Sequence, residues 1–132
     1  MWSHYSQYHT GIVLGLSMEA DLDFFISPIK IEYQDTYEIL NYLDNPEKST
    51  IDTLKIKSTQ WEYEHEIRIY KDVSGLHQIN QNAINEIYFG IKTNEKDIED
   101  ICNLCKEKGL SDIRFYKGQQ SYGSFEVLFE EI

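Results

Sequence analysis

Cysteine and proline are scarce in this sequence, with only two of each among its 132 residues. Two cysteines are too few for the disulfide framework of a small secreted domain. We therefore expect a reducing compartment, and the cytoplasm is the predicted location. The prolines, Pro28 and Pro46, mark local boundaries and no linker follows them. A single domain over residues 1–132 is the predicted organisation.

Basic residues are also scarce, since 12 Lys and Arg oppose 23 Asp and Glu to give a formal net charge of −11. The acidic residues are spread along the chain and form no tail. Such a field repels phosphate groups, so binding to nucleic acid or to an anionic membrane surface is disfavoured. No apolar run approaches the roughly 20 residues that cross a bilayer. We therefore predict that the protein does not associate with a membrane.

Several motifs with known chemistry are missing: a phosphate-binding glycine-rich loop, a serine-hydrolase elbow and a zinc-protease helix. His4 and His9 are five residues apart, which is not the spacing that lets two histidines on one helix share a metal ion. No third ligand stands near them, so we predict no metal site. Cys102 and Cys105 fall on the apolar stripe of a predicted helix, which favours core packing over redox chemistry.

The residues that are plentiful are aromatic and apolar, including ten tyrosines and six phenylalanines. A short apolar run between glycines predicts a strand over 11–16 that is buried on both faces, and a nearly all-apolar run predicts one over 84–91. Further strands are predicted over 29–33, 62–70, 112–117 and 124–129. Helical spacing predicts one helix over about 36–43 and another over about 95–108. A further helix is predicted to begin after a cap at Ser49 or Thr50. The fold class that follows is α+β: a mixed, mostly antiparallel sheet of about six strands with three or four packed helices.

The segment 57–68 (Lys-Ser-Thr-Gln-Trp-Glu-Tyr-Glu-His-Glu-Ile-Arg) is the most distinctive stretch. If it is a strand, alternation places Glu64, Glu66 and Arg68 on one face, with the two carboxylates about 7 Å apart. Arg68 would keep its neighbour ionised, and an ionised carboxylate in a cleft can orient a ribose hydroxyl or stabilise a developing cation. The alternative is a solvated sheet face on which the charges satisfy one another.

The N-terminal segment Trp2-Ser3-His4-Tyr5 offers a second candidate, because His4 could act as a general base or a ligand. The alternative is structural, with the aromatic rings packed on the sheet and His4 hydrogen-bonded to backbone.

Three pieces in order resemble the bacterial family catalogued as domain of unknown function 2971. They are the Trp2–Tyr5 motif followed by His9-x-Gly11-Ile12, the pattern Lys57-Ser58-x-x-Trp61-x-Tyr63-Glu64-x-Glu66-x-Arg68, and Ile84-x-x-Ile87-x-x-Gly90. Members of that family typically carry a comparable stretch upstream of the first motif. The resemblance therefore implies that this chain is the C-terminal portion of a larger domain, whose missing upstream segment would be a partner.

The family has no settled activity, but its Glu-x-Glu segment is similar in form to the strand of mono-ADP-ribosyltransferases. By that analogy Glu66 is catalytic, Glu64 is accessory and Arg68 supports them, with NAD as the cofactor that the analogy suggests. The motif residues His4, Tyr5, Trp61 and Lys57 are the predicted binding residues.

Two functions remain open at the level of the sequence. One is a nucleotide-binding or ADP-ribosyltransferase-like remnant built around the Glu-x-Glu-x-Arg segment. The other is a non-catalytic protein-interaction module, in a bacterial stress or phage-defence system. Loss of part of a domain uncovers apolar surface, so a homodimer or a visible apolar patch is expected in either case.

Overall fold

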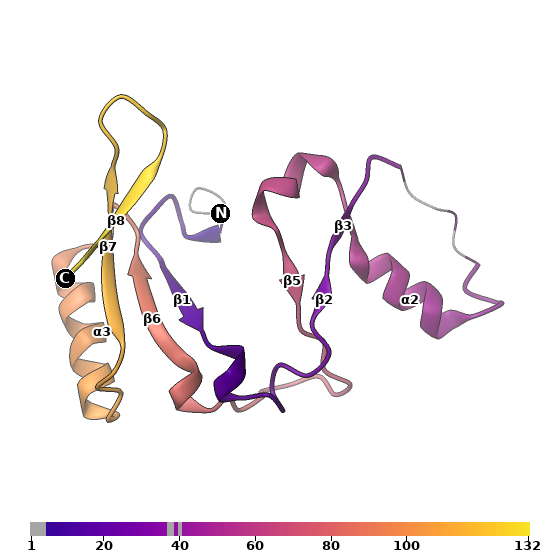
Figure 1. The fold of residues 1–132 in the computed structure, drawn as a ribbon, viewed down its shortest axis with the longest axis horizontal. Helices are drawn as coiled ribbons and strands as arrows, with labels where there is room; N and C mark the ends of the chain where they lie inside the picture. Colours follow the sequence, from indigo (N-terminus) through magenta and orange to yellow (C-terminus); the bar gives the residue numbers. More distant parts are fainter. Residues whose placement is uncertain (1–4, 37–38, 40) are drawn as a thin grey trace. The chain divides into compact units, whose positions relative to one another are not determined.

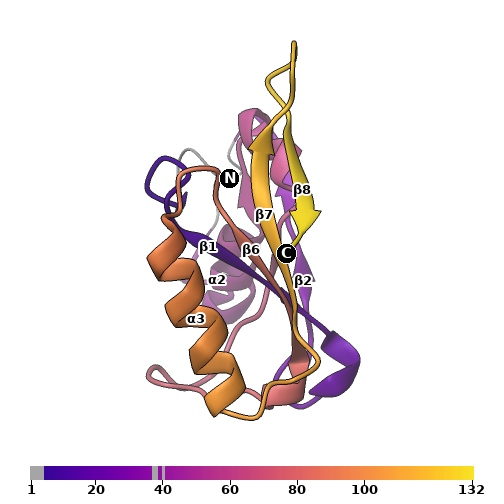
Figure 2. The same ribbon diagram turned by 90° about the vertical axis from the view of Figure 1, so that its left-hand side faces the viewer.

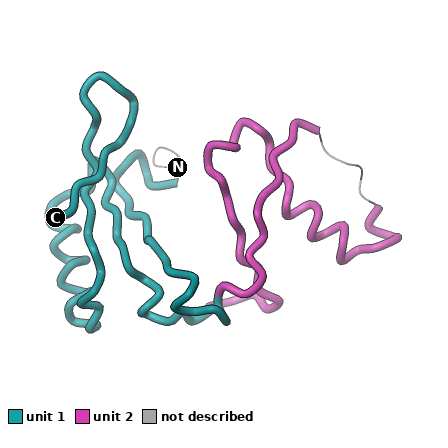
Figure 3. The backbone as a smooth tube through the Cα atoms, in the orientation of Figure 1, with its two compact units in different colours: residues 1–24, 77–132 teal, residues 25–76 magenta. Residues whose placement is uncertain are grey.

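A computed structural model describes residues 5–36, 39 and 41–132 of the chain. The chain forms two compact units, drawn in teal and magenta in Figure 3. Unit 1 consists of residues 1–24 and 77–132, and unit 2 consists of residues 25–76. The organisation as a single domain stays a prediction.

Unit 1 is built on a four-stranded mixed sheet (Figure 1). Its described elements are strand β1 (Ile12–Leu16), the 3-10 helices η1 (Met18–Ala20) and η3 (Gln81–Ala83), strand β6 (Ile84–Phe89), helix α3 (Glu95–Glu107), and strands β7 (Arg114–Gln120) and β8 (Val127–Glu131). The strand order is β1-β6-β7-β8, in which β6 and β7 are parallel and the other neighbours are antiparallel. The predicted α+β class is confirmed, with four strands in this sheet where about six were expected.

The hydrophobic core of unit 1 lies between the sheet and helix α3, which runs along one face of the sheet (Figure 2). The helix begins where the Asn94 side chain accepts a hydrogen bond of 2.8 Å from the Asp97 N–H, an N-cap of the usual kind. The core cluster contains Ile87, Phe89, Ile98, Cys105 and Ile113. Cys102 packs against this cluster, so core packing of both cysteines is confirmed, and burial raises the pKa of both thiols.

Strand β1 differs from its prediction as a strand buried on both faces. It lies at an edge of the sheet, and every second side chain is exposed. The exposed fractions of Ile12, Leu14 and Leu16 are 39%, 45% and 41%. An apolar run alone does not reveal whether other elements cover each face of a strand, and this strand at the edge of the sheet is only partly covered.

Strands β7 and β8, which overlap the strands predicted over 112–117 and 124–129, form a hairpin, and the loop between them spans residues 121–126. Phe125 lies in that loop and is completely exposed, although the strand predicted over 124–129 included it. The strand begins only at Val127, which leaves Phe125 outside the pleated register.

Unit 2 contains short elements in two small sheets. They are strands β2 (Ile29–Lys30) and β3 (Glu32–Tyr33), helix α2 (Pro46–Lys55), strand β4 (Ile56–Lys57), the 3-10 helix η2 (Thr59–Glu64) and strand β5 (Ile67–Arg68). Strands β2 and β5 are antiparallel, and β3 and β4 are parallel. Ile31 stands between β2 and β3, is 3% exposed, and donates its N–H to the carbonyl of Glu66.

Helix α2 begins earlier than predicted. The side chain of Asn45 accepts from the Lys48 N–H at 3.0 Å, and Pro46 takes the first helical position, which suits its fixed φ. Ser49 and Thr50, the predicted caps, lie inside the helix. The helix predicted over 36–43 falls partly on residues 37, 38 and 40, which lie outside the described residues, and its described end, Tyr42 and Leu43, lies in a turn.

In the described part of the chain, no helix has both the length and the apolar character needed to span a bilayer.

Candidate functional site

The segment predicted as a strand over residues 62–70 is a strand only at Ile67 and Arg68. Residues Thr59–Glu64 form a 3-10 helix, which the Ser58 side chain caps by accepting from the Gln60 N–H at 3.4 Å. His65 then adopts the left-handed conformation with φ 46° and ends the helix. The apolar residues of the segment alternate as they would in a strand. The Ser58 cap and the left-handed His65 instead start and end a 3-10 helix.

Lys57 brings the two glutamates together despite this change. It ends strand β4, and its Nζ donates to Oε2 of Glu64 and, at 3.0 Å, to Oε2 of Glu66. Glu64 ends the 3-10 helix and Glu66 precedes β5, so the left-handed turn at His65 separates two carboxylates that share one ammonium group. Their proximity therefore comes from a common cation and not from alternation along a strand.

Arg68 holds the second carboxylate from the other side. Its Nε donates to Oε1 of Glu66 and its Nη2 to Oε2 at 3.1 Å, the bidentate arrangement that guanidinium and carboxylate groups favour. Its Nη1 donates to the carbonyl oxygen of Leu54 at 2.7 Å, and the Tyr70 hydroxyl donates to the same oxygen at 2.8 Å. The network therefore runs from Glu64 through Lys57, Glu66 and Arg68 to the end of helix α2.

The backbone around Glu66 is fixed as well. The Glu66 N–H donates to the Tyr33 hydroxyl at 2.7 Å, and its carbonyl accepts from the Ile31 N–H at 3.1 Å. Side chain and backbone of Glu66 are thus both held by groups of unit 2. Because both its backbone and its carboxylate are hydrogen-bonded, the Glu66 side chain keeps one orientation, as a group that positions a ligand must.

The charges in this network stabilise one another. The hydrogen bond from Arg68, with help from Lys57, lowers the pKa of Glu66 to about 2 against the opposing effect of burial. Burial disfavours the ammonium form of Lys57, but its hydrogen bonds to Glu64 and Glu66 outweigh burial and raise its pKa. The hydrogen bond to Glu66 likewise raises the pKa of Arg68. All three groups are therefore ionised at neutral pH.

The network is largely withdrawn from solvent, unlike a solvated face, but Glu66 and Arg68 satisfy one another as the alternative prediction expected. The exposed fractions of the side chains are 16% for Lys57, 7% for Glu64, 26% for Glu66 and 29% for Arg68. The Oε1 atom of Glu64 is buried without a hydrogen-bond partner. A buried ion pair is stable only when the hydrogen-bonding capacity of its charged groups is satisfied. The Oε1 atom of Glu64 is therefore one acceptor in the network that lacks a donor.

Trp61 borders the network. The Lys57 ammonium lies 5.0 Å from the centroid of its ring, within the range of a cation–π contact, and Tyr63 lies beside it at 6.1 Å between ring centroids. Trp61 and Lys57, both predicted binding residues, therefore meet in the same cluster as Glu64, Glu66 and Arg68.

A cleft of about 550 Å³ lies next to this cluster in unit 2. Its lining is mostly aliphatic and aromatic and includes one lysine and one aspartate: Ile26, Ser27, Ile29, Ile51, Leu54, Tyr70, Lys71 and Asp72. Ile29 is the strand partner of Arg68, and Leu54 and Tyr70 are joined to Arg68 through the Leu54 carbonyl. The sequence alone did not indicate the cleft, because its walls come from three separated segments.

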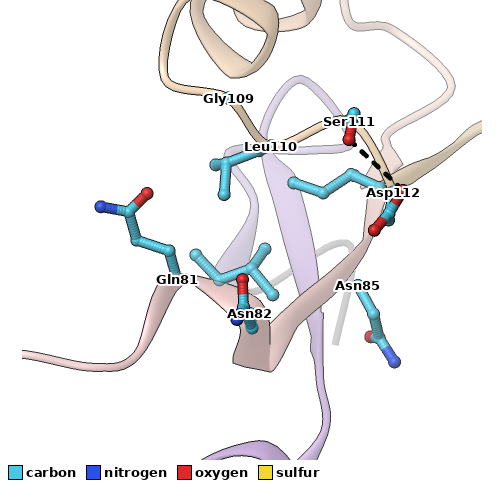
Figure 4. A pocket seen from close by; sticks show the side chains of 9 residues that line it. Gln81, Asn82, Asn85, Gly109, Leu110, Ser111 and Asp112 are labelled. Carbon is cyan, nitrogen blue, oxygen red and sulfur yellow. Dashed lines mark hydrogen bonds between the residues drawn. The ribbon is translucent and has the colours of Figure 1, made fainter.

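A second pocket, of about 120 Å³, lies in unit 1 (Figure 4). Gln81, Asn82 and Asn85 line one side, and Ser111 donates to Asp112 at 3.3 Å on the other. Its volume is below the range of about 300–1,000 Å³ that suits a small-molecule ligand. The cleft of unit 2 is therefore the better candidate site.

The N-terminal candidates are only partly placed. His4 and Trp2 lie outside the described residues, and Tyr5 belongs to unit 1 with an exposed fraction of 64%. Gln7, Tyr8 and His9 follow with φ angles of 45°, 56° and 72°, three successive left-handed residues.

Two segments singled out from the sequence, around His9–Ile12 and Ile84–Gly90, meet in unit 1. The His9 carbonyl accepts from the Lys92 N–H at 2.9 Å, and the Gly90 N–H donates to the Gly11 carbonyl at 3.0 Å. A Cβ atom at Gly90 would lie 2.1 Å from the His9 oxygen, so the backbones approach closely enough to require glycine. These motif residues fix the left-handed turn beside β6.

Among the described residues, no group of three His, Cys, Asp or Glu side chains is arranged to hold a metal ion. The cationic groups Lys57 and Arg68 occupy the carboxylate oxygens of Glu66. The chemistry that the cluster offers is therefore electrostatic: fixed charges beside an apolar cleft.

Comparison with known proteins gives one family match. Neither a search of curated proteins nor a search of solved structures finds a match. The family model described as protein of unknown function (DUF2971) matches residues 1–69, which include the whole Lys57–Arg68 segment and helix α2. The chain therefore belongs to the DUF2971 family of proteins of unknown function.

Proposed function

We propose that unit 2 binds a nucleotide or a similar small molecule in the cleft beside the Lys57–Glu66–Arg68 network. The observation that carries this proposal is the cleft of about 550 Å³ whose wall residue Leu54 accepts hydrogen bonds from both Arg68 and Tyr70. Ligand sites commonly combine a mostly apolar cleft of this size with a few fixed polar groups. A planar base would pack against Ile29, Ile51 and Leu54.

The polar part of such a ligand would lie beside Lys71 and Asp72, the charged residues that line the cleft. An aspartate carboxylate can accept hydrogen bonds from ribose hydroxyls, and a lysine can attract a phosphate group. Because the whole chain is acidic, we expect the uncharged nucleoside part to contribute most of the binding free energy.

In this proposal Glu66 is a positioning residue and not the nucleophile or the cation-stabilising group of an ADP-ribosyl transfer. Both of its carboxylate oxygens already accept hydrogen bonds from Lys57 and Arg68. A catalytic role would require it to exchange these partners for a ribose hydroxyl. Binding is therefore the function that the geometry favours, and transfer from NAD is the further step to be tested.

The direct test is a calorimetric titration with NAD and with adenosine on the wild type, Glu66→Gln and Ile51→Glu. We expect the wild type to bind, Glu66→Gln to bind more weakly because Arg68 loses its anchor, and Ile51→Glu to lose binding because a charge enters the apolar cleft. Thr50→Glu is the matched control, since the neighbouring residue of α2 does not line the cleft. Absence of binding by both the wild type and Glu66→Gln would sink the proposal.

A protein-interaction module is the second candidate, favoured by two completely exposed aromatic residues, Tyr122 and Phe125, in the β7–β8 loop. Exposed aromatic side chains of this kind are common anchors of protein interfaces. A pull-down from the native host should return one identified partner that Tyr122→Ser with Phe125→Ser loses and Glu66→Gln retains. A partner captured equally by all variants would count against this candidate.

A further inference from the structure

Strand β1 forms one edge of the main sheet, and its outer side has no strand partner among the described residues. In an antiparallel pair, every second residue points its N–H and C=O groups away from the neighbouring strand. β1 is paired with β6 on one side only, so these groups are available on the other. An edge of this kind is a template for a further strand.

The side chains of β1 are apolar on the face that continues the core. Ile12, Leu14 and Leu16 stand opposite Phe89, Ile87 and Ile84 of β6, two of which are in the core cluster while the third packs against it. Yet the three β1 side chains are 39–45% exposed. The core layer beneath α3 therefore extends to β1 without being covered there.

The two edges of the sheet differ in charge. The segment from Gly11 to Ser17 has no charged residue and no proline, in a chain of net charge −11. The opposite edge, β8, carries Glu130 and Glu131 and is preceded by Glu126. Natural sheets protect edge strands with charges. The β8 edge has this protection and the β1 edge lacks it.

We propose that β1 pairs with β1 of a second copy of this chain, so that two four-stranded sheets join across a two-fold axis. Antiparallel pairing of identical strands is self-complementary, and each copy supplies the apolar strand that the other lacks. An uncharged edge is the part of this acidic chain on which two copies approach with the least repulsion. The residues of this edge belong to unit 1, and those that line the cleft belong to unit 2.

The test is the oligomeric state by analytical ultracentrifugation, with Leu14→Lys and Leu128→Lys as a matched pair. Both leucines are half-exposed on edge strands, at 45% and 54%. We expect the wild type and Leu128→Lys to be dimers and Leu14→Lys to be a monomer at the same concentration. Added salt should favour the dimer, because it screens the repulsion between two acidic copies.

Amide hydrogen exchange on the wild type tests the same interface without a substitution. Exchange in residues 12–16 should slow as the protein concentration rises, while exchange in β8 should not change. A wild type that stays monomeric, a Leu14→Lys variant that remains a dimer, or a dimer lost equally in both variants would overturn the proposal. Concentration-independent protection of β1 would do the same, because it would show that the edge is covered within one chain.

Discussion

Unit 1 and unit 2 are each stabilised internally by a different kind of interaction. Unit 1 has a conventional apolar core beneath α3, in which Phe89 is completely buried. Unit 2 has only short strands, and Lys57 and Arg68 form largely solvent-shielded ion pairs there with Glu64 and Glu66. Apolar cores contribute stability, whereas removing charged groups from water costs folding free energy. Such shielded charges are common at sites where ligands bind. The difference between the units therefore suggests that unit 1 serves as scaffold and unit 2 carries the site.

The largest expected effect tests the scaffold side of the comparison. Replacing Phe89 by alanine leaves a cavity in a site with no exposure, and such substitutions cost about 3–5 kcal/mol of unfolding free energy. Urea denaturation followed by the fluorescence of the aromatic residues would measure the loss. A change below about 1 kcal/mol would mean that the cluster beneath α3 is not the core that stabilises unit 1.

The next effect tests the network. Lys57→Met removes the cation shared by Glu64 and Glu66 and leaves the 7%-exposed Glu64 carboxylate without a partner. We expect a loss of about 1–3 kcal/mol, from leaving a buried charged group unsatisfied. Lys48→Met is the control, because its pair with Asp52 lies at the surface, where solvent screening leaves an ion pair with little effect on stability. Equal denaturation midpoints for the two variants would contradict the structural role of Lys57.

A smaller effect concerns the dependence of stability on pH. The folded pKa of Glu66, about 2, lies below its ordinary value of 4.5, so Glu66 binds its proton more weakly in the folded state. Its contribution to stability is therefore present above pH 4.5 and is lost as the pH falls toward 2. Glu66→Gln should flatten the stability profile in that interval. An unchanged slope between wild type and variant would show that Glu66 is not held as described.

The smallest effect compares two phenylalanines within unit 1. Phe125 is completely exposed in the hairpin loop, so Phe125→Ser should change the unfolding free energy by less than about 0.5 kcal/mol. Thermal denaturation of this variant beside Phe89→Ala would measure the contrast. A marked destabilisation by Phe125→Ser would indicate that the loop packs against another part of the protein.

Sequence patterns predicted unit 1 better than unit 2. Strand β6 and helix α3 were found because long periodic apolar patterns end at clear signals, such as Gly109 with its left-handed φ of 74°. The start of α2 was missed although Asn45 and Pro46 form an ordinary cap with proline at the first position. That signal is present in the sequence, where Pro46 was taken only as a local boundary.

The sequence identified the residues of the candidate site but not the backbone conformation that brings them together. Glu64, Glu66, Arg68, Lys57 and Trp61 were singled out from one segment, and the structure brings them together. The left-handed residue His65 and the shared ammonium of Lys57 depend on tertiary contacts that alternation does not encode. The cleft depends on segments about 25 and 45 residues apart in sequence, so no local pattern indicates it.

The central claim is that unit 2 carries a ligand site that unit 1 does not. The most direct measurement is an amide chemical-shift titration of the isotope-labelled chain with NAD. We predict shifts concentrated at residues 26–29, 51–54 and 68–72, which line or adjoin the cleft. Shifts confined to residues 77–132, or no shifts at saturating NAD and adenosine, would contradict the claim.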